Sequence, residues 1–320
     1  MKTTGFGILL LAALLCISSA DRAVGAMFGS GANTFDIEFV GIGNPGNVAD
    51  LTGSPNPVGS VATAFRIGKF EISEDMINKA NTLGGLSITK DARGVDKPAT
   101  SVSWNEAARF VNWLNTSTGS PPAYKFALQP GDAGYAVNAN AQPWAAGDGA
   151  AFNPTNPYRS NLAQYFLPST HEWYKAAYYD PTSGGYYDYP TGSDTAPTGV
   201  NDGTAAGTAV YNRPFGQGPA DIMLAGALSP YGTMGQGGNV FELEENDFDL
   251  ANGPSSDARG LRGGYWSSGA LNLLSSNRVS SAPTNQQNFI GFRVATVPEP
   301  STAMLLTLAS LGLLRRRTAR

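Results

Sequence analysis

The stretch Phe166-Leu167-Pro168-Ser169-Thr170-His171-Glu172-Trp173 predicts the entry of the chain into a short helix. Ser169 and Glu172 have the spacing of a capping box, in which each side chain satisfies a backbone N–H at the start of a helix. Ser103-Trp104-Asn105-Glu106 repeats that spacing. Apolar residues follow both boxes at helical intervals, so two helices are expected. These residues are Trp173, Ala176 and Ala177 after one box, and Ala107, Phe110, Val111 and Leu114 after the other.

The rest of the chain alternates short apolar runs with long glycine- and proline-rich stretches. Residues 35–40, 65–72, 238–243, 259–266 and 289–295 are typical of strands. Ser73 predicts the N-cap of a further helix, with Glu74 and Asp75 in its first turn. Residues 120–159 form a polar insertion, and residues 181–237 are mostly loop. With 39 glycines, 21 prolines and 10% aromatic residues, the chain is expected to form an irregular, loop-rich α+β domain.

The N-terminus has the pattern of a secretory signal peptide, covering residues 1–26 at most. Lys2 precedes an apolar run over residues 6–17, and cleavage is expected after Ala20 or Ala26. Cys16 is the chain's single cysteine and lies in the segment that would be removed. Acylation of Cys16 is the weaker alternative, because Leu14 and Leu15 before it are not small. The mature protein is therefore expected to hold no thiol and no disulfide.

The C-terminus, residues 297–320, contains three features in order. Pro298, Glu299 and Pro300 precede an apolar stretch over residues 301–314, and Arg315, Arg316 and Arg317 follow it. Such an apolar stretch could instead form a helix packed on the core. The three arginines that follow it argue against this alternative, because consecutive arginines cannot be buried without partners. The order closely resembles the PEP-CTERM sorting signal. That resemblance implies a short transmembrane helix, removal of the tail by an exosortase, and sorting to the surface of a Gram-negative bacterium, with membrane anchoring before cleavage.

Charge excludes one class of partner. Five of the 21 basic residues lie in the two ends, whereas all 25 acidic residues lie from Asp21 to Glu299, so the segment between the ends is strongly acidic. Binding to nucleic acid depends mainly on neutralising phosphates, which an acidic domain does poorly. The sequence contains no phosphate-binding loop motif, and no nucleotide cofactor is expected.

Six motifs in order resemble the formylglycine-generating enzyme family, the sulfatase-modifying factor domain, over residues 35–296. They are Phe65 to Ser73, Pro98 to Ala107, Phe166 to Trp173, Gly238-Asn239-Val240-Phe241-Glu242-Leu243, Arg262-Gly263-Gly264-Tyr265-Trp266 and Gly291-Phe292-Arg293. The resemblance implies a C-type-lectin-like α+β fold. It also implies two cysteines that hold Cu(I) shortly after Arg-Gly-Gly. The matching positions here are near Ser268 and Leu273, neither of which suits Cu(I), so both are expected to be ordinary loop residues.

The sequence also offers few residues for other kinds of catalysis. A sister branch of the family uses histidine-ligated iron, but His171 is the only histidine and is expected to face solvent. One imidazole cannot form a multi-histidine iron site, and the same scarcity disfavours a Ser-His-Asp triad. Carboxylate pairs for glycosidase-type acid–base catalysis are available at Glu244 and Glu245 or Asp247 and Asp249. We expect these acidic residues to form a solvated face instead.

The family also binds calcium in a structural role, and calcium is the cofactor implied by the resemblance that the residues of this chain do not argue against. One set of ligands implied by it comprises the carbonyls of Gly238 and Val240 and the carboxylate of Glu242, although the position three residues before Gly238 is Gly235, which has no ligand to offer. The second set comprises Asn212, Asp221 and the Met223 carbonyl. The alternative for Glu242 is a buried ion pair with Arg262 or Arg293. If calcium is bound, it should raise the melting temperature.

Three functions from different classes remain at this stage. The first is an exported, non-catalytic binding or matrix protein, with exopolysaccharide as a ligand. The second is an enzyme, either a formylglycine-generating-type oxidase or one with an unrecognised oxygen-ligand site. The third is a purely structural surface protein. A tyrosine cluster formed by Tyr178, Tyr179, Tyr186, Tyr187 and Tyr189 could stack on sugar rings, but is expected mainly to cover the loop region.

Overall fold

The computed structural model describes residues 24–298 of the chain. Almost all of the expected signal peptide, Cys16 and the apolar and basic parts of the expected sorting signal lie outside the described residues. Within residues 24–298, no helix is both long enough and apolar enough to cross a membrane. The C-terminal stretch predicted to span the membrane is outside that range.

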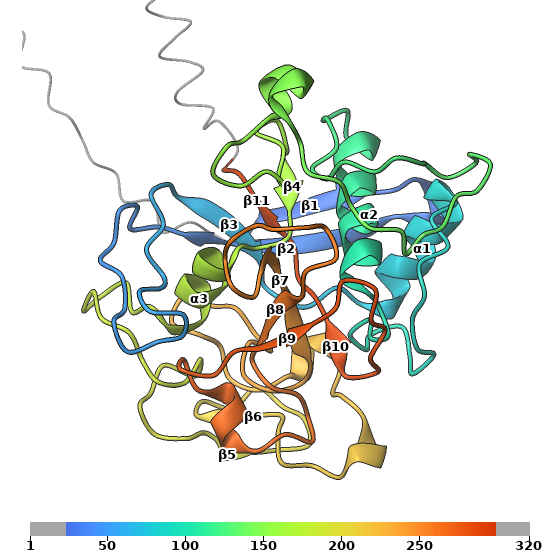
Figure 1. Ribbon diagram of the computed structural model, residues 1–320. Coiled ribbons are helices and arrows are strands. Elements are labelled where there is room, and N and C mark those ends of the chain that lie inside the picture. The colour runs from blue at the N-terminus through green and yellow to red at the C-terminus, as the bar shows by residue number, and fades with distance from the viewer. Residues whose placement is uncertain (1–23, 299–320) are drawn as a thin grey trace, which may run out of the picture.

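The larger sheet crosses the upper half of the molecule in Figure 1 and has five strands. Their spatial order is β1 (Val24–Phe28), β2 (Phe35–Ile42), β3 (Phe65–Gly68), β11 (Ala295–Thr296) and β4 (Tyr165–Phe166). All neighbouring strands are antiparallel. Phe35, Ile37 and Phe39 alternate with more exposed residues along β2, so one face of that strand packs on the core.

A second sheet of four strands lies beside the first and carries most of the residues discussed below (Figure 1). Its order is β10 (Ile290–Gly291), β7 (Phe241–Asp247), β8 (Arg259–Arg262) and β9 (Val279–Ser281). A two-stranded sheet of β5 (Thr198–Gly199) and β6 (Thr208–Ala209) belongs to the long loop region.

Three helices begin where the sequence predicted. Ser73, Ser103 and Ser169 are the N-caps of α1 (Glu74–Gly84), α2 (Trp104–Ser117) and α3 (Thr170–Tyr178). The capping boxes at α2 and α3 are both complete. Five short 3-10 helices complete the elements of residues 24–298: η1 (Gly31–Asn33), η2 (Ala146–Ala151), η3 (Phe215–Gln217), η4 (Ile222–Leu224) and η5 (Ala270–Leu273).

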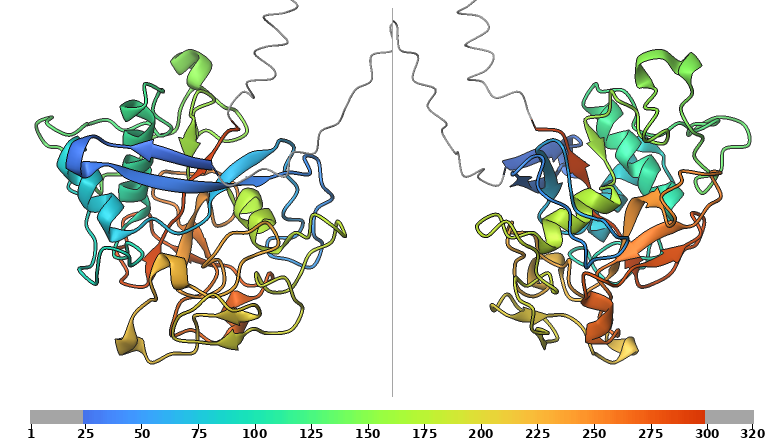
Figure 2. Two further views of the ribbon diagram at one scale, coloured as in Figure 1. Left: turned by 180° about the vertical axis from the view of Figure 1, so that it is seen from behind. Right: turned by 60° about the vertical axis from the view of Figure 1, so that its left-hand side comes forward.

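The largest hydrophobic core lies between α2 and the two sheets. Twelve consecutive residues of α2, Trp104 to Asn115, are buried, and Phe110 packs edge-on against Phe292 with ring centroids 5.7 Å apart. The aromatic share of the sequence is therefore used for packing, as expected. Residues 181–237 form a loop-rich region at the end of the molecule opposite β1 and β11 (Figure 1 and Figure 2).

Three predicted strands have bounds that differ from the prediction. The strand predicted at residues 238–243 begins only at Phe241, because Gly238 and Asn239 have left-handed φ angles of 86° and 57°. The strand predicted at 259–266 ends at Arg262, before a turn at Gly263 and Gly264. The strand predicted at 289–295 divides into β10 and β11, which belong to different sheets.

Candidate functional site

The turn after β8 brings together the two positions where the family would place its catalytic cysteines. A methyl group added at Gly264 would lie 2.8 Å from Ser268 Oγ and 2.9 Å from Leu273 Cδ1. Ser268 Oγ accepts a hydrogen bond from the Tyr265 N–H at 3.0 Å and donates one to the Tyr265 carbonyl at 2.8 Å. The Ser268 hydroxyl therefore stabilises its own turn.

Leu273 is fully buried in η5. It packs in a cluster with Tyr189, Ala209 and Tyr211, which come from the loop-rich region. Soft Cu(I) prefers sulfur ligands, and a serine and a leucine provide none. These two residues have structural contacts of their own, and their correspondence to the family's cysteines stays a prediction.

Glu242, on β7, forms a buried ion pair with Arg293. Arg293 Nε lies 2.6 Å from Glu242 Oε2, and Trp173 Nε1 also donates to this oxygen at 2.7 Å. The other carboxylate oxygen lies 2.5 Å from an Arg293 guanidinium nitrogen. Burial disfavours the charge on Arg293, but the neighbouring Glu242 carboxylate outweighs burial and raises the pKa of Arg293. Of the two pairings considered for Glu242, the structure shows the one with Arg293.

The first predicted calcium set does not fit a calcium ion as the residues lie. Arg293 already supplies the positive charge at both oxygens of Glu242. A side chain at Gly235 would meet Glu71, whose Oε1 would be only 2.4 Å from the added Cβ. Glu71 therefore fills the space that a ligand at position 235 would need. Across residues 24–298, no group of three or more His, Cys, Asp or Glu residues is arranged to hold a metal ion.

The three residues of the second predicted calcium site interact with different parts of the protein or lie at its surface. Asn212 is exposed and uses its backbone N–H to bond the Ser268 carbonyl at 2.9 Å. Asp221 forms an ion pair with Lys97 at 2.9 Å, and Met223 is 54% exposed. No hydrogen bond joins Asn212 to Asp221 in the described part of the chain. Calcium therefore stays a prediction, and the donor sets count against it.

The acidic run on β7 is not the solvated face that the sequence suggested. Glu244, Glu245 and Asp247 are at most 1% exposed. Their ion-pair partners are Arg262 and Arg278 for Glu244, Arg159 for Glu245 and Arg259 for Asp247, at 2.6–2.7 Å. The prediction was wrong because these arginines come from distant parts of the chain. Only Asp249, beyond the end of β7, is exposed.

The prediction for His171 was also wrong. Its side chain is half-buried, and Nδ1 accepts a hydrogen bond from the Gly59 N–H at 3.1 Å. Burial is the main cause that lowers the pKa of His171. The imidazole therefore fixes the loop that contains Gly59 against α3.

The tyrosine cluster covers the loop region, as the sequence favoured. Tyr178, Tyr179 and Tyr189 are at most 8% exposed. Tyr186 packs edge-on against Tyr179, with ring centroids 5.1 Å apart, and its hydroxyl lies 2.9 Å from the Val48 carbonyl. Tyr178, Tyr179 and Tyr189 therefore offer little ring surface to a sugar, whereas Tyr186 and Tyr187 are half-buried.

These features define an α+β domain with a C-type-lectin-like fold and a core of buried ion pairs. The chain belongs to the sulfatase-modifying factor enzyme 1-like domain family, which matches residues 46–297. A PEP-CTERM protein-sorting motif matches residues 296–317. The motif implies export, processing by an exosortase and sorting to the cell surface of a Gram-negative bacterium.

Several known proteins are similar to this chain. Hercynine oxygenase from Mycolicibacterium thermoresistibile is 32% identical over 149 residues, which are 43% of this chain and 33% of that protein. The chain thus matches about a third of the length of this curated relative. Treponema denticola variable protein 1 has a TM-score of 0.57 at 21% identity, over 87% of this chain and 100% of that one. PvdO from Pseudomonas aeruginosa has a TM-score of 0.52 at 17% identity, over 87% and 100% of the two chains. At these identities, the structural likeness establishes the fold.

Proposed function

We propose that this chain is a non-catalytic binding or matrix protein of the cell surface, with exopolysaccharide as its ligand. The supporting observation concerns the two residues that the resemblance matches to the family's catalytic cysteines. Ser268 is hydrogen-bonded within its turn, and Leu273 is fully buried. No cysteine follows Cys16 in the sequence. A fold retained without its thiols, together with a surface-sorting motif, supports a role in binding.

The family's oxidase activity is the alternative that can be tested most directly. The purified protein would be loaded with Cu(I) and incubated with a peptide containing Cys-x-Pro-x-Arg. We expect no aldehyde by mass spectrometry, because no thiolate is available to bind copper. Conversion of the peptide by a preparation free of other oxidases would overturn the non-catalytic assignment.

Ligand binding is tested with polysaccharide from the producing organism and a glycan panel, in calcium and in EGTA. We expect binding to the polysaccharide that does not change with EGTA, because Arg293 already neutralises Glu242. A melting curve in each of the two buffers tests separately whether the protein binds calcium. A higher melting temperature in calcium would restore the predicted calcium site, whereas a folded protein without glycan binding would favour a structural role.

A further inference from the structure

A cavity of about 470 Å³, here called the α2 cavity, lies between α2 and the insertion of residues 120–159, which passes beside this helix (Figure 1). Leu86, after α1, and Pro122 and Pro130 of the insertion give it apolar walls. The lining residues of α2 have the i, i+3, i+4, i+7 spacing of one helix face: Arg109, Asn112, Trp113 and Thr116. A cavity of this size with few polar groups is typical of a small-molecule site.

Arg109 is a buried arginine without a carboxylate partner. It is 3% exposed and forms no ion pair within residues 24–298. The other arginines of that range that are at most 9% exposed all pair with carboxylates, namely Arg259, Arg262, Arg278 and Arg293. Burial lowers the pKa of Arg109, and no carboxylate opposes this effect. An arginine stays protonated in a protein, so the α2 cavity has a positive charge at its wall that the described chain does not neutralise.

The insertion holds the Arg109 guanidinium in place. Nε donates to the Val137 carbonyl at 3.0 Å, and Nη1 donates to the Leu128 carbonyl at 3.1 Å. The guanidinium carbon lies 3.9 Å from the ring centroid of Phe126 and 4.7 Å from that of Tyr135. Nη2 has no hydrogen-bond partner within residues 24–298, and it is not one of the fully buried nitrogens that lack a partner. This nitrogen is therefore the part of the fixed guanidinium that is left for a ligand.

Trp113 adds a second donor on the same face of α2. It follows Arg109 by four residues, and side chains with this spacing are neighbours on a helix. Its indole N–H also has no acceptor in the described part of the chain. A methyl group added at Gly84 would lie 2.5 Å from Trp113 Cδ1 and 2.9 Å from Nε1, so the glycine leaves this edge of the ring uncovered. The α2 cavity thus offers two N–H donors without acceptors, and no carboxylate lines it.

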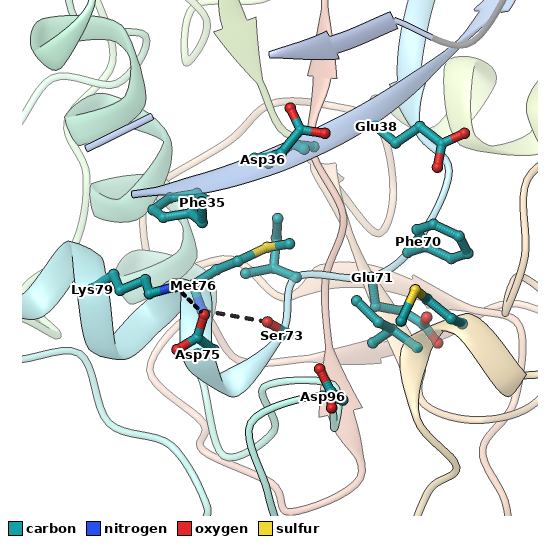
Figure 3. A pocket seen from close by; sticks show the side chains of 14 residues that line it. Phe35, Asp36, Glu38, Phe70, Glu71, Ser73, Asp75, Met76, Lys79 and Asp96 are labelled. Carbon is teal, nitrogen blue, oxygen red and sulfur yellow. Dashed lines mark hydrogen bonds and ion pairs between the residues drawn. The ribbon is translucent and has the colours of Figure 1, made fainter. Parts of the chain in front are cut away.

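A second cavity, beside β2, has the opposite charge (Figure 3). Five carboxylates line it, those of Asp36, Glu38, Glu71, Asp75 and Asp96. Lysines pair with only two of them, since Lys69 lies 2.9 Å from Glu38 and Lys79 lies 2.6 Å from Asp75. The excess negative charge would repel an anion. An anionic ligand is therefore expected in the α2 cavity and not in the one beside β2.

We propose that the α2 cavity binds a carboxylate carried by a six-membered ring, with Arg109 and Trp113 donating to the carboxylate and the ring lying against the apolar walls. A carboxylate has one negative charge, which matches one guanidinium, whereas a phosphate monoester has close to two at neutral pH. A rigid ring loses little conformational freedom on binding. Two sources share this chemistry, a free aromatic acid and a uronic acid residue of a polymer. The inference goes beyond the proposed function, because a free acid would fit whether or not the protein binds polysaccharide.

Ligand-observed NMR with the full chain in a mild detergent tests the proposal. The probes are benzoate beside benzamide, and trigalacturonate beside its methyl ester. We expect a carboxylate to bind and its neutral counterpart to fail, because only the charge and its acceptor oxygens differ. Binding of benzoate alone identifies a free aromatic acid as the source, and binding of trigalacturonate identifies a uronic acid.

Three results would overturn the proposal. They are no binding of either carboxylate, equal binding of the neutral counterparts, and displacement of the bound carboxylate by inorganic phosphate at equal concentration. If the protein binds neutral polysaccharide but neither carboxylate, this inference fails and the proposed function stands.

Variants locate the binding in the α2 cavity. Gln129 is an exposed lining residue, so Gln129→Glu adds a negative charge without changing a buried side chain. We expect this variant to weaken carboxylate binding about threefold, as for exposed charges, and Arg109→Gln to weaken it about tenfold or more, as for a charge-assisted hydrogen bond. The matched control is Gln217→Glu, which adds the same charge in η3, outside the cavity, and should leave binding unchanged.

Melting curves show which of these variants are folded. Because Arg109→Gln removes buried contacts, Gln129→Glu decides the location even if the arginine variant does not fold. Carboxylate binding that is the same in Gln129→Glu and Gln217→Glu would place the ligand outside the α2 cavity.

Discussion

Arg293 is the single residue whose removal we expect to destabilise the protein most. Its guanidinium is fully buried against Glu242, and it also donates to the carbonyls of Gly68 and Met234 at 2.8 Å. Arg293→Met leaves the Glu242 carboxylate buried without a counter-charge. Loss of one partner of a buried ion pair costs about 3–5 kcal/mol, which urea denaturation would measure as a lower free energy of unfolding.

The matched control for Arg293→Met is an ion pair at the surface. Lys79 and Asp75 are 2.6 Å apart, and their side chains are 23% and 35% exposed. Lys79→Met should change the free energy of unfolding by less than about 1 kcal/mol, because water screens exposed pairs. Similar small losses in both variants would show that the buried pair is not important for stability.

The raised pKa of Glu71 predicts that the stability of the protein depends on pH. Its folded-state pKa is about 7, above the ordinary value of 4.5, chiefly because of burial. The folded protein therefore holds this proton more tightly than the unfolded chain. The resulting stabilisation is complete below pH 4.5 and is lost as the pH rises to about 7.

Glu71→Gln removes this titration while retaining a side chain of similar shape. Relative to the variant, the wild type should lose roughly 2 to 3 kcal/mol of unfolding free energy between about pH 5 and pH 8. Urea denaturation of both proteins at the two pH values provides the measurement. Parallel pH dependence in the two proteins would mean that Glu71 does not titrate in this range.

At the scale of elements, the pairing of β1 favours one of the two expected cleavage sites. Val24, Gly25 and Ala26 pair with Phe39, Glu38 and Ile37 of β2. Cleavage after Ala26 would remove these three residues from the five of β1, whereas cleavage after Ala20 would leave the strand whole. We predict that the mature protein begins at Asp21, which N-terminal sequencing of the exported protein would establish.

A comparison of two engineered starts tests the same point by stability. A chain starting at Asp21 should melt at a higher temperature than one starting at Met27, because the shorter chain leaves part of β2 as an unpaired edge. Equal melting temperatures would show that the first half of β1 adds nothing to the fold, and would leave Ala26 as a reasonable cleavage site.

Local signals account for the elements that the sequence predicted well. Ser103 with Glu106 and Ser169 with Glu172 are within one turn of each other, so α2 and α3 could be located from spacing alone. The acidic residues of β7 could not be interpreted in this way. The partners of Glu244 and Glu245 are Arg262, Arg278 and Arg159, and only the fold brings them to the strand.

The same reasoning separates the parts of the site that the sequence could and could not predict. The missing catalytic thiols were evident, because they require only the identities of Ser268 and Leu273. The surroundings of Glu71 were not, since Asn239 and Arg293 beside it come from segments without a shared motif. An unpartnered oxygen such as Glu71 Oε2 leaves no mark in a sequence.

At the scale of the whole molecule, the two ends of the described chain emerge together. Val24 and Val297 line the same cavity, at the five-stranded sheet that contains β1 and β11. The loop-rich region of residues 181–237 lies at the opposite end (Figure 1 and Figure 2). If the tail holds the protein on the membrane before cleavage, as the sequence predicts, we expect the sheet end to face the lipid and the loops to face away.

Single cysteines can test this orientation, because no cysteine follows Cys16. Met27, in β1, is 70% exposed, and Ala205, in the loop region, is also exposed. In cells that lack exosortase, a bulky maleimide should label Ala205→Cys faster than Met27→Cys, since the membrane would shield the sheet end. Both variants should react at similar rates in detergent, which controls for intrinsic reactivity. Equal rates on the membrane would contradict this orientation, because a loosely tethered domain would expose both ends alike.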